Sequence, residues 1–577
     1  MKNKLQKIIN VARGIEDGDL ILKNGTVFNT ISGEIYVTDV IISGDKIAGI
    51  GEYDKAEKII DVSGKFIIPG FIDGHVHAES SMVSLEEFSR TLISRGVTTA
   101  IVDPHELANV AGESAIEYFI SESEKLMINL FIMLPSCVPA TDFETSGAEF
   151  RKELYEKYIG NKNVLGLAEM MNYPGVIYSD ENTLEKIMAC QGKLIDGHAP
   201  MLSGKDLCAY IASGVTSEHE CITAKEALEK LRLGMYIMLR EGSASKNLKD
   251  LLPLVNKFNS QRCFLSTDDR HPDDLLNEGS IDHMVRMIID QTSNAMRAVR
   301  MASFNAAEYY GLKKLGAIAP GKLADILIVD DIKKLNIVSV IKSGNIVYDT
   351  GKFLIPRSFE IGKIQKKFPR IFNSMNVKDF DHNKLMIPAE DGKIRVIEIE
   401  PEQIITKCKE YKPLIKNGFV VSDIKHDILK ICVVERHKGT GNIGLGFVKG
   451  FGLYKGAIAT TIAHDSHNII AVGTDDNMIF KVIKKIIAIG GGVTLFDGNK
   501  FMTLPLQIGG LMSVDNIDIV SAKLIEIREM IKSLGCELSD PLMQLSFLAL
   551  PVIPELKITD QGLFDSSNFK KVSLWSK

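Results

Sequence analysis

Short runs of alternating apolar and polar residues open the chain and return near its middle. From Asp19 to about Lys65, the runs DLILKNGTVFNT and IYVTDVIISGDKIAGIG are broken by Asn-Gly, Ser-Gly and Gly-Asp pairs, which is the pattern of antiparallel hairpins. The same texture returns from Gly316 to Phe353 in GAIAPGKLADILIV and IVSVIKSGNIVYDTGKF. The two stretches are therefore predicted to share one small β domain that is split in the sequence.

Between these stretches, strand-like apolar runs alternate with helix-like segments at the spacing of repeated βα units, which favours a parallel sheet or barrel. Eight strand candidates can be counted, and eight is the number that closes a (β/α)8 barrel. They are FIIPGFIDGHVH, VTTAIVDPH, NLFIMLPSC, VLGLAEMMN, KLIDGHAP, VTSEHE, MYIMLREGSA and CFLSTDD. The fold class is therefore predicted to be α/β, with such a barrel at its centre.

The texture changes again after about Ile361, through the basic stretch KIQKKFPR. Apolar positions at three- and four-residue intervals then predict helices from Met478 to Ile489 and from Ile517 to Leu534, in an additional C-terminal α+β domain. The expected segments are an N-terminal helix with the first part of the small β domain (1–65), the barrel (66–315), the second part of the β domain (316–360) and the C-terminal domain (361–577).

Length and composition restrict the class of protein. The 577 residues suggest three or four domains, and a net charge of -6 leaves no basic surface of the kind that nucleic acid requires. No run approaches the roughly 20 apolar residues of a membrane span, and the start of the chain reads as a surface helix rather than a signal peptide. The eight cysteines are scattered without a C-x-x-C pair, which fits a reducing cytoplasm.

The C-terminal ends of barrel strands carry the chemistry of this fold, so the polar residues at those ends form one candidate set. A lone His-x-His pair more often satisfies hydrogen bonds than binds a metal. Here, however, His75 and His77 face the same side of the first strand and other metal-binding residue types end the later strands. The others are Asp103, His105 and Glu106 on the second strand, Glu169 on the fourth, His198 on the fifth, His219 on the sixth, Glu241 on the seventh and Asp268 on the eighth.

This set supplies the parts of a binuclear metal centre, in which two cations share a bridging carboxylate and a hydroxide. His75 and His77 would hold the first ion with Asp268, His198 and His219 would hold the second, and Glu169 could bridge the two. The sequence therefore predicts a metal site formed by these six residues.

With these motifs in place, the chain resembles the amidohydrolase superfamily, and within it the bacterial adenine deaminase family most of all. Many binuclear members of the superfamily use a carboxylated lysine as the bridge, whereas VLGLAEMMN offers Glu169 and no lysine. The resemblance covers almost the whole chain. Its motifs are PGFIDGHVHAESSM, VDPHELANVAG, GLAEMMNYPGV, DGHAP, TSEHE, LREGSA, STDDRHP, AHDSHNI and LPLQIGGLMS.

The resemblance implies hydrolytic deamination of adenine to hypoxanthine and ammonia, in purine salvage, by hydroxide bound to two Mn²⁺ or Fe²⁺ ions; Zn²⁺ also suits mixed imidazole and carboxylate ligands. The catalytic residues would be Asp268, Glu169 and His219. Asp268 would move the hydroxide proton to a ring nitrogen or the leaving amine. Sequence alone leaves open whether His219 is a metal ligand or an electrophile beside the substrate.

Six further residues near the strand ends are candidates for binding the purine, and each has a plainer alternative. Ser80 could instead cap the following helix. His105 and Glu106 could instead orient a metal ligand, and Arg240 and Glu241 could form a buried ion pair. The candidates are Glu79, Ser80, His105, Glu106, Arg240 and Glu241.

The last domain contains two motifs whose roles stay open. Residues 439–444 spell G-x-G-x-x-G, but the extended sequence that follows favours a turn between strands over a dinucleotide site. His464 and His467 could hold a third metal or contribute to the active-site mouth, and the alternative is a hydrogen-bonded turn that docks this domain on the barrel.

Three other functions compete with adenine deamination. A cyclic-amide hydrolase would use the same barrel, although Glu169 in place of lysine counts against it. A deaminase of another aminopurine or of an adenine nucleoside would differ only in its pocket. A barrel that had lost its metals could act as a binding module, but all six ligand positions hold capable residues. Besides a small purine substrate, the expected partner is a second copy of the chain in a homodimer.

Overall fold

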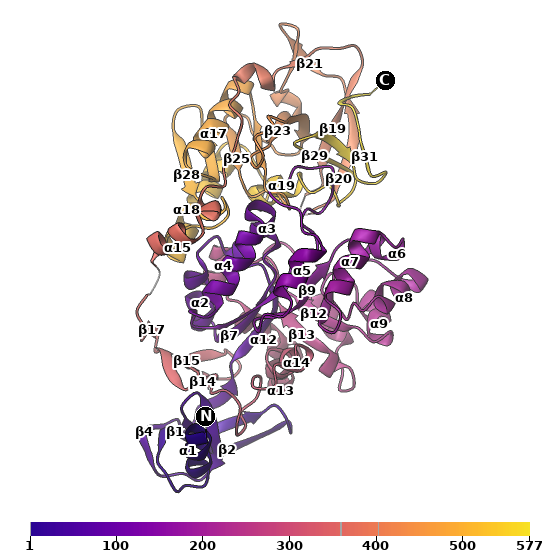
Figure 1. Ribbon diagram of the computed structural model, residues 1–577. Coiled ribbons are helices and arrows are strands. Elements are labelled where there is room, and N and C mark those ends of the chain that lie inside the picture. The colour runs from indigo at the N-terminus through magenta and orange to yellow at the C-terminus, as the bar shows by residue number, and fades with distance from the viewer. Residues whose placement is uncertain (1, 358–359, 402, 577) are drawn as a thin grey trace.

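The computed structural model describes residues 2–357, 360–401 and 403–576 (Figure 1). Within them, all eight predicted barrel runs form strands, and each strand pairs in parallel with its neighbour in two sheets, β6 to β10 and β11 to β13. A parallel bridge between Val76 and Asp268 joins the first strand to the segment after the last. The strands are β6 (Phe71–Val76), β7 (Val97–Val102), β8 (Asn129–Leu134), β9 (Val164–Met170), β10 (Leu194–Gly197), β11 (Ser217–Glu218), β12 (Tyr236–Arg240) and β13 (Cys263–Ser266).

Amphipathic helices cover the outside of the barrel between the strands. In α2 (Leu85–Ser94), the side chain of Ser84 accepts a hydrogen bond from the Glu87 amide and so caps the first turn, while Leu85, Phe88 and Leu92 are buried. Others are α4 (Glu113–Ser123), α7 (Glu181–Ala189), α8 (Gly204–Ala212), α9 (Ala224–Arg232) and α12 (Ile281–Thr292). Because Ser84 is the cap, the alternative reading of Ser80 as the helix cap is wrong.

The two hairpin stretches form one nine-stranded sheet at the end of the molecule nearest the N-terminus (Figure 1). α1 (Lys2–Ala12) packs on it through the buried Val11. The strands are β1 (Gly18–Asn29), β2 (Glu34–Ser43), β3 (Lys46–Gly51), β4 (Ala56–Asp61), β5 (Phe66–Pro69), β14 (Ile326–Asp331), β15 (Asn336–Lys342), β16 (Asn345–Asp349) and β17 (Lys352–Phe353). The first half of the run FIIPGFIDGHVH therefore belongs to this sheet, as β5 between β1 and β14, and the chain enters the barrel at Gly70.

We accordingly propose the domain limits predicted from the sequence with one change, which moves the first boundary from 65/66 to Gly70. Residues 1 and 577, which end the outer segments, lie outside the described residues.

A second nine-stranded sheet organises the C-terminal domain. α17 (Asp476–Ala488) packs on its strands β25, β26 and β27, and α18 (Ile517–Ser533) lies beside β28. The bounds of these two helices are within two residues of those predicted from the sequence. The G-x-G-x-x-G segment runs from the connection between antiparallel β23 and β24 into the first two residues of β24, as expected for a turn between strands. The strands are β19 (Lys393–Ile399), β20 (Thr406–Tyr411), β23 (Ile428–Val434), β24 (Ile443–Lys449), β25 (Ala457–Thr460), β26 (Ile469–Gly473), β27 (Gly492–Phe496), β28 (Phe501–Pro505) and β32 (Trp575–Ser576).

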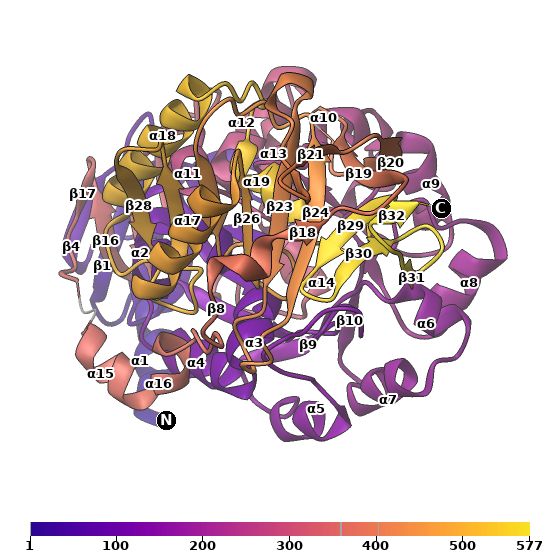
Figure 2. The ribbon, with the colours of Figure 1, turned by 90° about the horizontal axis from the view of Figure 1, so that it is seen from above.

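The C-terminal domain rests on the barrel at the end where α3 (His105–Ala111) begins (Figures 1 and 2). The Asp560 carboxylate accepts hydrogen bonds from the Thr145 amide at 2.8 Å and the Thr145 hydroxyl at 2.7 Å. Ser513 forms a bridge to Val83, ahead of α2. The barrel mouth is therefore covered by a domain far away in the sequence. Among the described residues, no helix is long and apolar enough to cross a membrane.

Candidate metal centre

The six predicted ligands come together at the C-terminal ends of the barrel strands. His75 lies in β6 and His77 directly after it, Glu169 lies in β9, and His198 and His219 follow β10 and β11. Asp268 follows β13. All are buried except His198, whose side chain is 26% exposed. The fold thus brings together residues that are far apart in sequence, because parallel strands end at one face of the barrel.

Glu169 occupies the centre of this cluster, with one oxygen toward each histidine pair. Its Oε1 lies 3.4 Å from His77 Nε2 and 3.8 Å from His75 Nε2. Its Oε2 lies 2.6 Å from His198 Nδ1 and 3.2 Å from His219 Nε2. A carboxylate in this position can bridge two cations, each held by one pair of imidazoles.

Asp268 completes the half of the cluster formed by His75 and His77. Its Oδ1 lies 3.0 Å from His77 Nε2 and 3.7 Å from His75 Nε2. The residue has φ of 58°, the left-handed region that a non-glycine residue rarely adopts, and it is fixed by backbone hydrogen bonds to His75 and His77. The strained backbone of Asp268 is thus held in place at the residue whose carboxylate contacts the histidine nitrogens.

The nitrogen lone pairs fit a metal centre. His77 Nδ1 donates to the Asp103 carbonyl at 3.0 Å, so in the neutral ring Nε2 carries the lone pair and faces Glu169 and Asp268. His75 Nε2 and both nitrogens of His219 are buried without a hydrogen-bond partner among the described residues. Buried polar atoms without partners are rare, and divalent cations would satisfy these nitrogens.

The charges around the cluster keep its carboxylates ionised. Burial alone would raise the pKa of Glu169, but His198, His219 and His77 hold this pKa well below its usual value. Burial would likewise raise the pKa of Asp268, and Arg240 with the two histidines of the first strand holds it well below its usual value. Ionised carboxylates are the form that binds metal ions.

Comparisons with known proteins show the family of this chain. The Amidohydrolase family matches residues 66–347, and the Adenine deaminase C-terminal domain matches residues 403–570. Adenine deaminase 2 of Carboxydothermus hydrogenoformans is 47% identical over 570 residues, which cover 98% of this chain and 99% of the relative. The chain belongs to the adenine deaminase family of amidohydrolases. Adenine deaminases of Dehalococcoides mccartyi and Desulfatibacillum aliphaticivorans are 45% and 48% identical, each over 99% of both chains.

In this family member, Arg240 forms a buried ion pair, which was the alternative to its binding the purine. Its Nη1 donates to Asp268 Oδ2 at 2.6 Å, and its Nη2 donates to Glu220 Oε2 at 3.0 Å. Glu220 was missed by the sequence analysis, although it directly follows His219 in TSEHE. Its Oε1 lies 3.7 Å from His198 Nδ1 and 3.6 Å from His219 Nε2, so it is a further candidate ligand. Arg240 therefore links a carboxylate from each half of the cluster.

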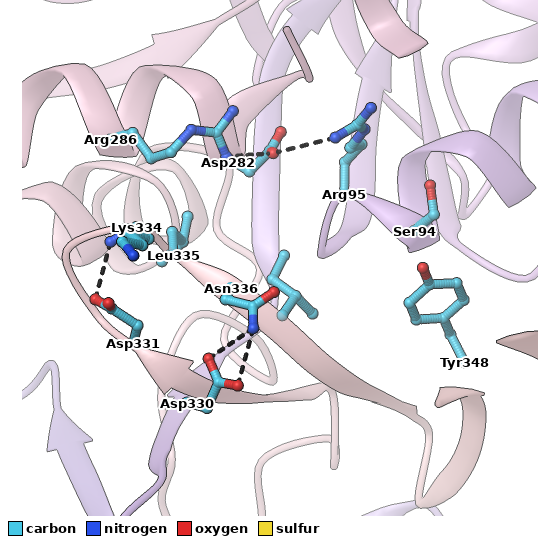
Figure 3. Close-up of a pocket in the computed structure, with 11 residues that line it drawn as sticks. Ser94, Arg95, Asp282, Arg286, Asp330, Asp331, Lys334, Leu335, Asn336 and Tyr348 are labelled. Atoms are coloured by element: carbon cyan, nitrogen blue, oxygen red, sulfur yellow. Dashed lines mark hydrogen bonds and ion pairs between the residues drawn. The ribbon is translucent and has the colours of Figure 1, made fainter. Parts of the chain in front are cut away.

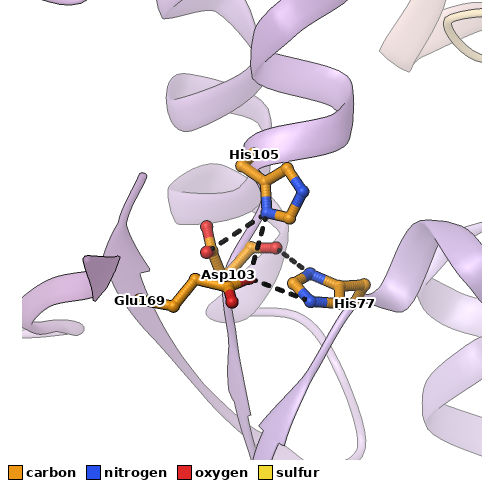
Figure 4. Close-up of side chains that lie close together, drawn as sticks. All are labelled: His77, Asp103, His105 and Glu169. Atoms are coloured by element: carbon orange, nitrogen blue, oxygen red, sulfur yellow. Dashed lines mark hydrogen bonds and ion pairs between the residues drawn. The ribbon is translucent and has the colours of Figure 1, made fainter. Parts of the chain in front are cut away.

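His105 lies against the metal cluster from the side of the second strand (Figure 4). Its Nδ1 is 3.2 Å from Asp103 Oδ2 and 3.6 Å from Glu169 Oε1. Burial would lower the pKa of His105, but the Asp103 carboxylate raises it to about 10. A positively charged imidazole beside Glu169 suits orientation of that carboxylate or contact with a substrate.

The remaining substrate candidates lie in three different surroundings. The Ser80 hydroxyl donates to Asp269, and Glu79 Oε1 accepts the Leu107 amide at 3.0 Å, so both residues are fixed beside the first strand. Glu106 points to the C-terminal domain, where it meets His464 and His467. Glu241 directly follows β12, and the nearby charges that act on its carboxylate come mainly from Lys246 and Arg270.

A charged hollow shown in Figure 3 lies elsewhere, between α2, α12 and the small β domain. It has a volume of about 530 Å³, and several of its polar groups pair with one another: Arg286 forms an ion pair with Asp282 at 2.8 Å, and Asn336 donates a hydrogen bond to Asp330 at 2.8 Å. Its lining contains neither histidine nor cysteine. The chemistry of the chain is therefore concentrated at the covered barrel mouth.

Proposed function

We propose that the protein catalyses the hydrolytic deamination of adenine to hypoxanthine and ammonia, as a step of purine salvage in the cytoplasm. The observation that carries this proposal is the central position of Glu169 between two histidine pairs, in a chain whose full-length relatives bear the name adenine deaminase. A cyclic-amide hydrolase is not favoured, because Glu169 stands where such enzymes are expected to carry lysine.

The proposed cofactor is a pair of divalent cations, Mn²⁺ or Fe²⁺, with Zn²⁺ also compatible with four imidazoles and two carboxylates. His75, His77 and Asp268 would hold one cation, His198 and His219 the other, and Glu169 both. When bound, the cations would lower the pKa of water and so supply a nucleophile at neutral pH. The proximity of His219 Nε2 to Glu169, 3.2 Å, supports the ligand role over the electrophile role.

The proton transfers are assigned to Asp268. Its Oδ1 faces the histidines of the first strand while its Oδ2 is held by Arg240, so the carboxylate has a fixed orientation at the site of attack. A carboxylate placed there can accept the proton of the attacking water and return it to a ring nitrogen or to the departing amine. Glu169 would keep the two halves of the centre at a fixed separation.

Substrate binding is assigned to the residues around the cluster on its second-strand side. His105 contacts Glu169, and Glu79, Ser80 and Glu106 line a small cavity between the barrel and the C-terminal domain. Arg240 is proposed to act on the substrate through Asp268, and Glu241 remains a candidate for contact with the purine edge. The net charge of -6 supports a small-molecule substrate rather than nucleic acid.

Ammonia release tests the proposed function directly. Purified protein loaded with Mn²⁺ would be incubated with adenine, adenosine, cytosine and dihydroorotate, with hypoxanthine formation followed in parallel. The expected result is turnover of adenine well above the other three compounds. Preferential turnover of adenosine or dihydroorotate would contradict the proposal. Light scattering during size-exclusion chromatography tests the proposed homodimer, since symmetric association is common among soluble enzymes.

A further inference from the structure

Glu106 is the point at which the C-terminal domain reaches the metal-bearing end of the barrel. Its Oε1 lies 3.2 Å from His464 Nδ1, and its Oε2 lies 2.9 Å from His467 Nε2. The three residues are 3%, 5% and 0% exposed, so one imidazole is buried against each carboxylate oxygen. A domain that merely docked on the barrel would not need to bring two histidines to a single carboxylate.

The turn that carries these histidines is held from several sides. The Ala463 amide donates to His467 Nδ1 at 3.2 Å, His437 Nε2 donates to the Ser466 carbonyl at 2.6 Å, and the buried Arg436 guanidinium donates to the His467 carbonyl. Because the Nδ1 lone pair of His467 is engaged, Nε2 carries the proton in the neutral ring. The 2.9 Å contact therefore sets an N–H against Glu106 Oε2 and does not offer a lone pair to a cation.

Glu106 lies one imidazole ring away from the central carboxylate of the metal cluster. His105 spans the gap, with Nδ1 3.6 Å from Glu169 Oε1 and Nε2 4.0 Å from Glu106 Oε1. In a purine, the carbon that bears the amino group and the nitrogens of the five-membered ring are separated by a distance comparable to the length of this imidazole ring. A purine attacked beside Glu169 can therefore extend its five-membered ring alongside His105 toward Glu106.

A small enclosed cavity adjoins the Glu106 carboxylate. Glu79, Ser80, Glu106 and His464 contribute to its lining, and its volume of about 10 Å³ is close to that of a single water molecule. His464 and His467 overcome burial and hold the pKa of Glu106 well below its usual value, so the cavity has an ionised carboxylate acceptor on one side.

We propose that the C-terminal domain forms part of the active site, with His464 and His467 holding the Glu106 carboxylate in place to accept the N–H of the five-membered ring of a free purine base. This rests on the proposed function. A nucleoside carries a sugar in place of that hydrogen, so it would leave the buried carboxylate without a donor. Sites built to hydrogen-bond a substrate group strongly reject analogues that lack it. Glu106 therefore selects the free base, and the two histidines are positioning residues.

The first test compares adenine with 9-methyladenine, which lacks the N–H at the relevant ring nitrogen. Glu106→Gln should lower kcat/KM for adenine by about 10- to 100-fold, mainly through KM, because a charge-assisted hydrogen bond becomes a neutral one. Glu106→Ala, which also creates space, should reduce the preference for adenine over 9-methyladenine by about the same factor. Equal preference in wild type and both variants would overturn the proposal.

The second test asks whether His464 acts through Glu106. His464→Asn should lower kcat/KM for adenine in the wild-type background and have no further effect in the Glu106→Gln background, because two residues of one unit are not additive. Thr145→Val is the matched control, since it removes a different contact between the domains, the 2.7 Å hydrogen bond to Asp560, and should leave kcat/KM unchanged. Additive losses, or an equal loss in the control, would indicate a purely structural role and overturn the proposal.

Metal analysis supplies the third outcome. The His467→Asn variant should bind as much Mn²⁺ per chain as wild type. If wild type bound a third equivalent of metal that this substitution removed, His467 would be a metal ligand and not a positioning residue. An inactive wild type with adenine would contradict the proposed function itself. An active wild type whose Glu106 variants behave normally would contradict only the present inference.

Discussion

Replacing Arg240 by methionine should both destabilise the fold and slow the reaction. The guanidinium, on a side chain only 4% exposed, is 2.6 Å from Asp268 Oδ2 and 3.0 Å from Glu220 Oε2. Arg240→Met keeps most of the bulk but leaves the buried Asp268 carboxylate and the largely buried Glu220 carboxylate without their shared countercharge. Removing one partner of a buried ion pair costs about 3–5 kcal/mol, so the free energy of unfolding should fall by about that amount.

The kinetic effect separates the two roles considered for this residue. If Arg240 orients Asp268, kcat for adenine should fall by about 100-fold or more, the lower end of what a positioned acid or base contributes, while KM changes little. Urea unfolding followed by circular dichroism and steady-state ammonia release measure the two effects. Arg151→Met is the control, because its 2.8 Å pair with Glu149 is exposed and is worth at most about 1 kcal/mol. A higher KM with unchanged kcat, or unchanged stability, would refute this reasoning.

Three further substitutions test other parts of the fold. Burial lowers the pKa of Lys557 from 10.5 to about 7. Between these two pH values, the unfolded chain therefore binds a proton that the folded chain lacks. The free energy of unfolding, measured with urea, should rise by about 1.4 kcal/mol per pH unit over this range, and Lys557→Met should abolish the rise. Burial would raise the pKa of Asp540, but the hydrogen bond with His271 helps to hold this pKa below 3.8. The ionised Asp540 therefore stabilises the folded chain above pH 3.8, and this stabilisation is lost as the pH falls below that value. Asp540→Asn should cost about 1.5–3 kcal/mol at pH 7 and less at pH 3, measured by urea unfolding. In Gly166→Ala, the new Cβ would lie 1.9 Å from a carbonyl oxygen of the adjacent strand, and the melting temperature should drop strongly, whereas Gly160→Ala, with open space around it, should not change it.

Most of the metal-binding set could be predicted from the sequence because two simple rules act together. Side chains at alternate positions of a strand share a face, which pairs His75 with His77, and parallel barrel strands end at one face, which adds Glu169 and Asp268. Neither rule requires knowledge of distances. The limit appears within one apolar run: β5 and β6 are separated only by Gly70, and hydrophobicity alone could not show that the chain changes sheets there.

Partners across the fold could not be predicted, because a residue type does not specify which distant group it will meet. Arg240 was a candidate for reading the purine, and only the geometry shows it between Asp268 and Glu220. The contacts of Glu106 with the C-terminal domain depend on how two domains dock, which no periodic pattern encodes. The hydrogen bond between Thr145 and Asp560 likewise joins residues 415 positions apart.

Titration of the metal-free protein with Mn²⁺ tests whether the site binds two metal ions bridged by Glu169. We expect adenine turnover to be absent without metal, to rise linearly as metal is added and to reach its plateau at two equivalents per chain. Replacing the bridging Glu169 by glutamine should abolish that plateau. Full activity in the metal-free protein, or a plateau at two equivalents that survives Glu169→Gln unchanged, would contradict a binuclear centre built around Glu169.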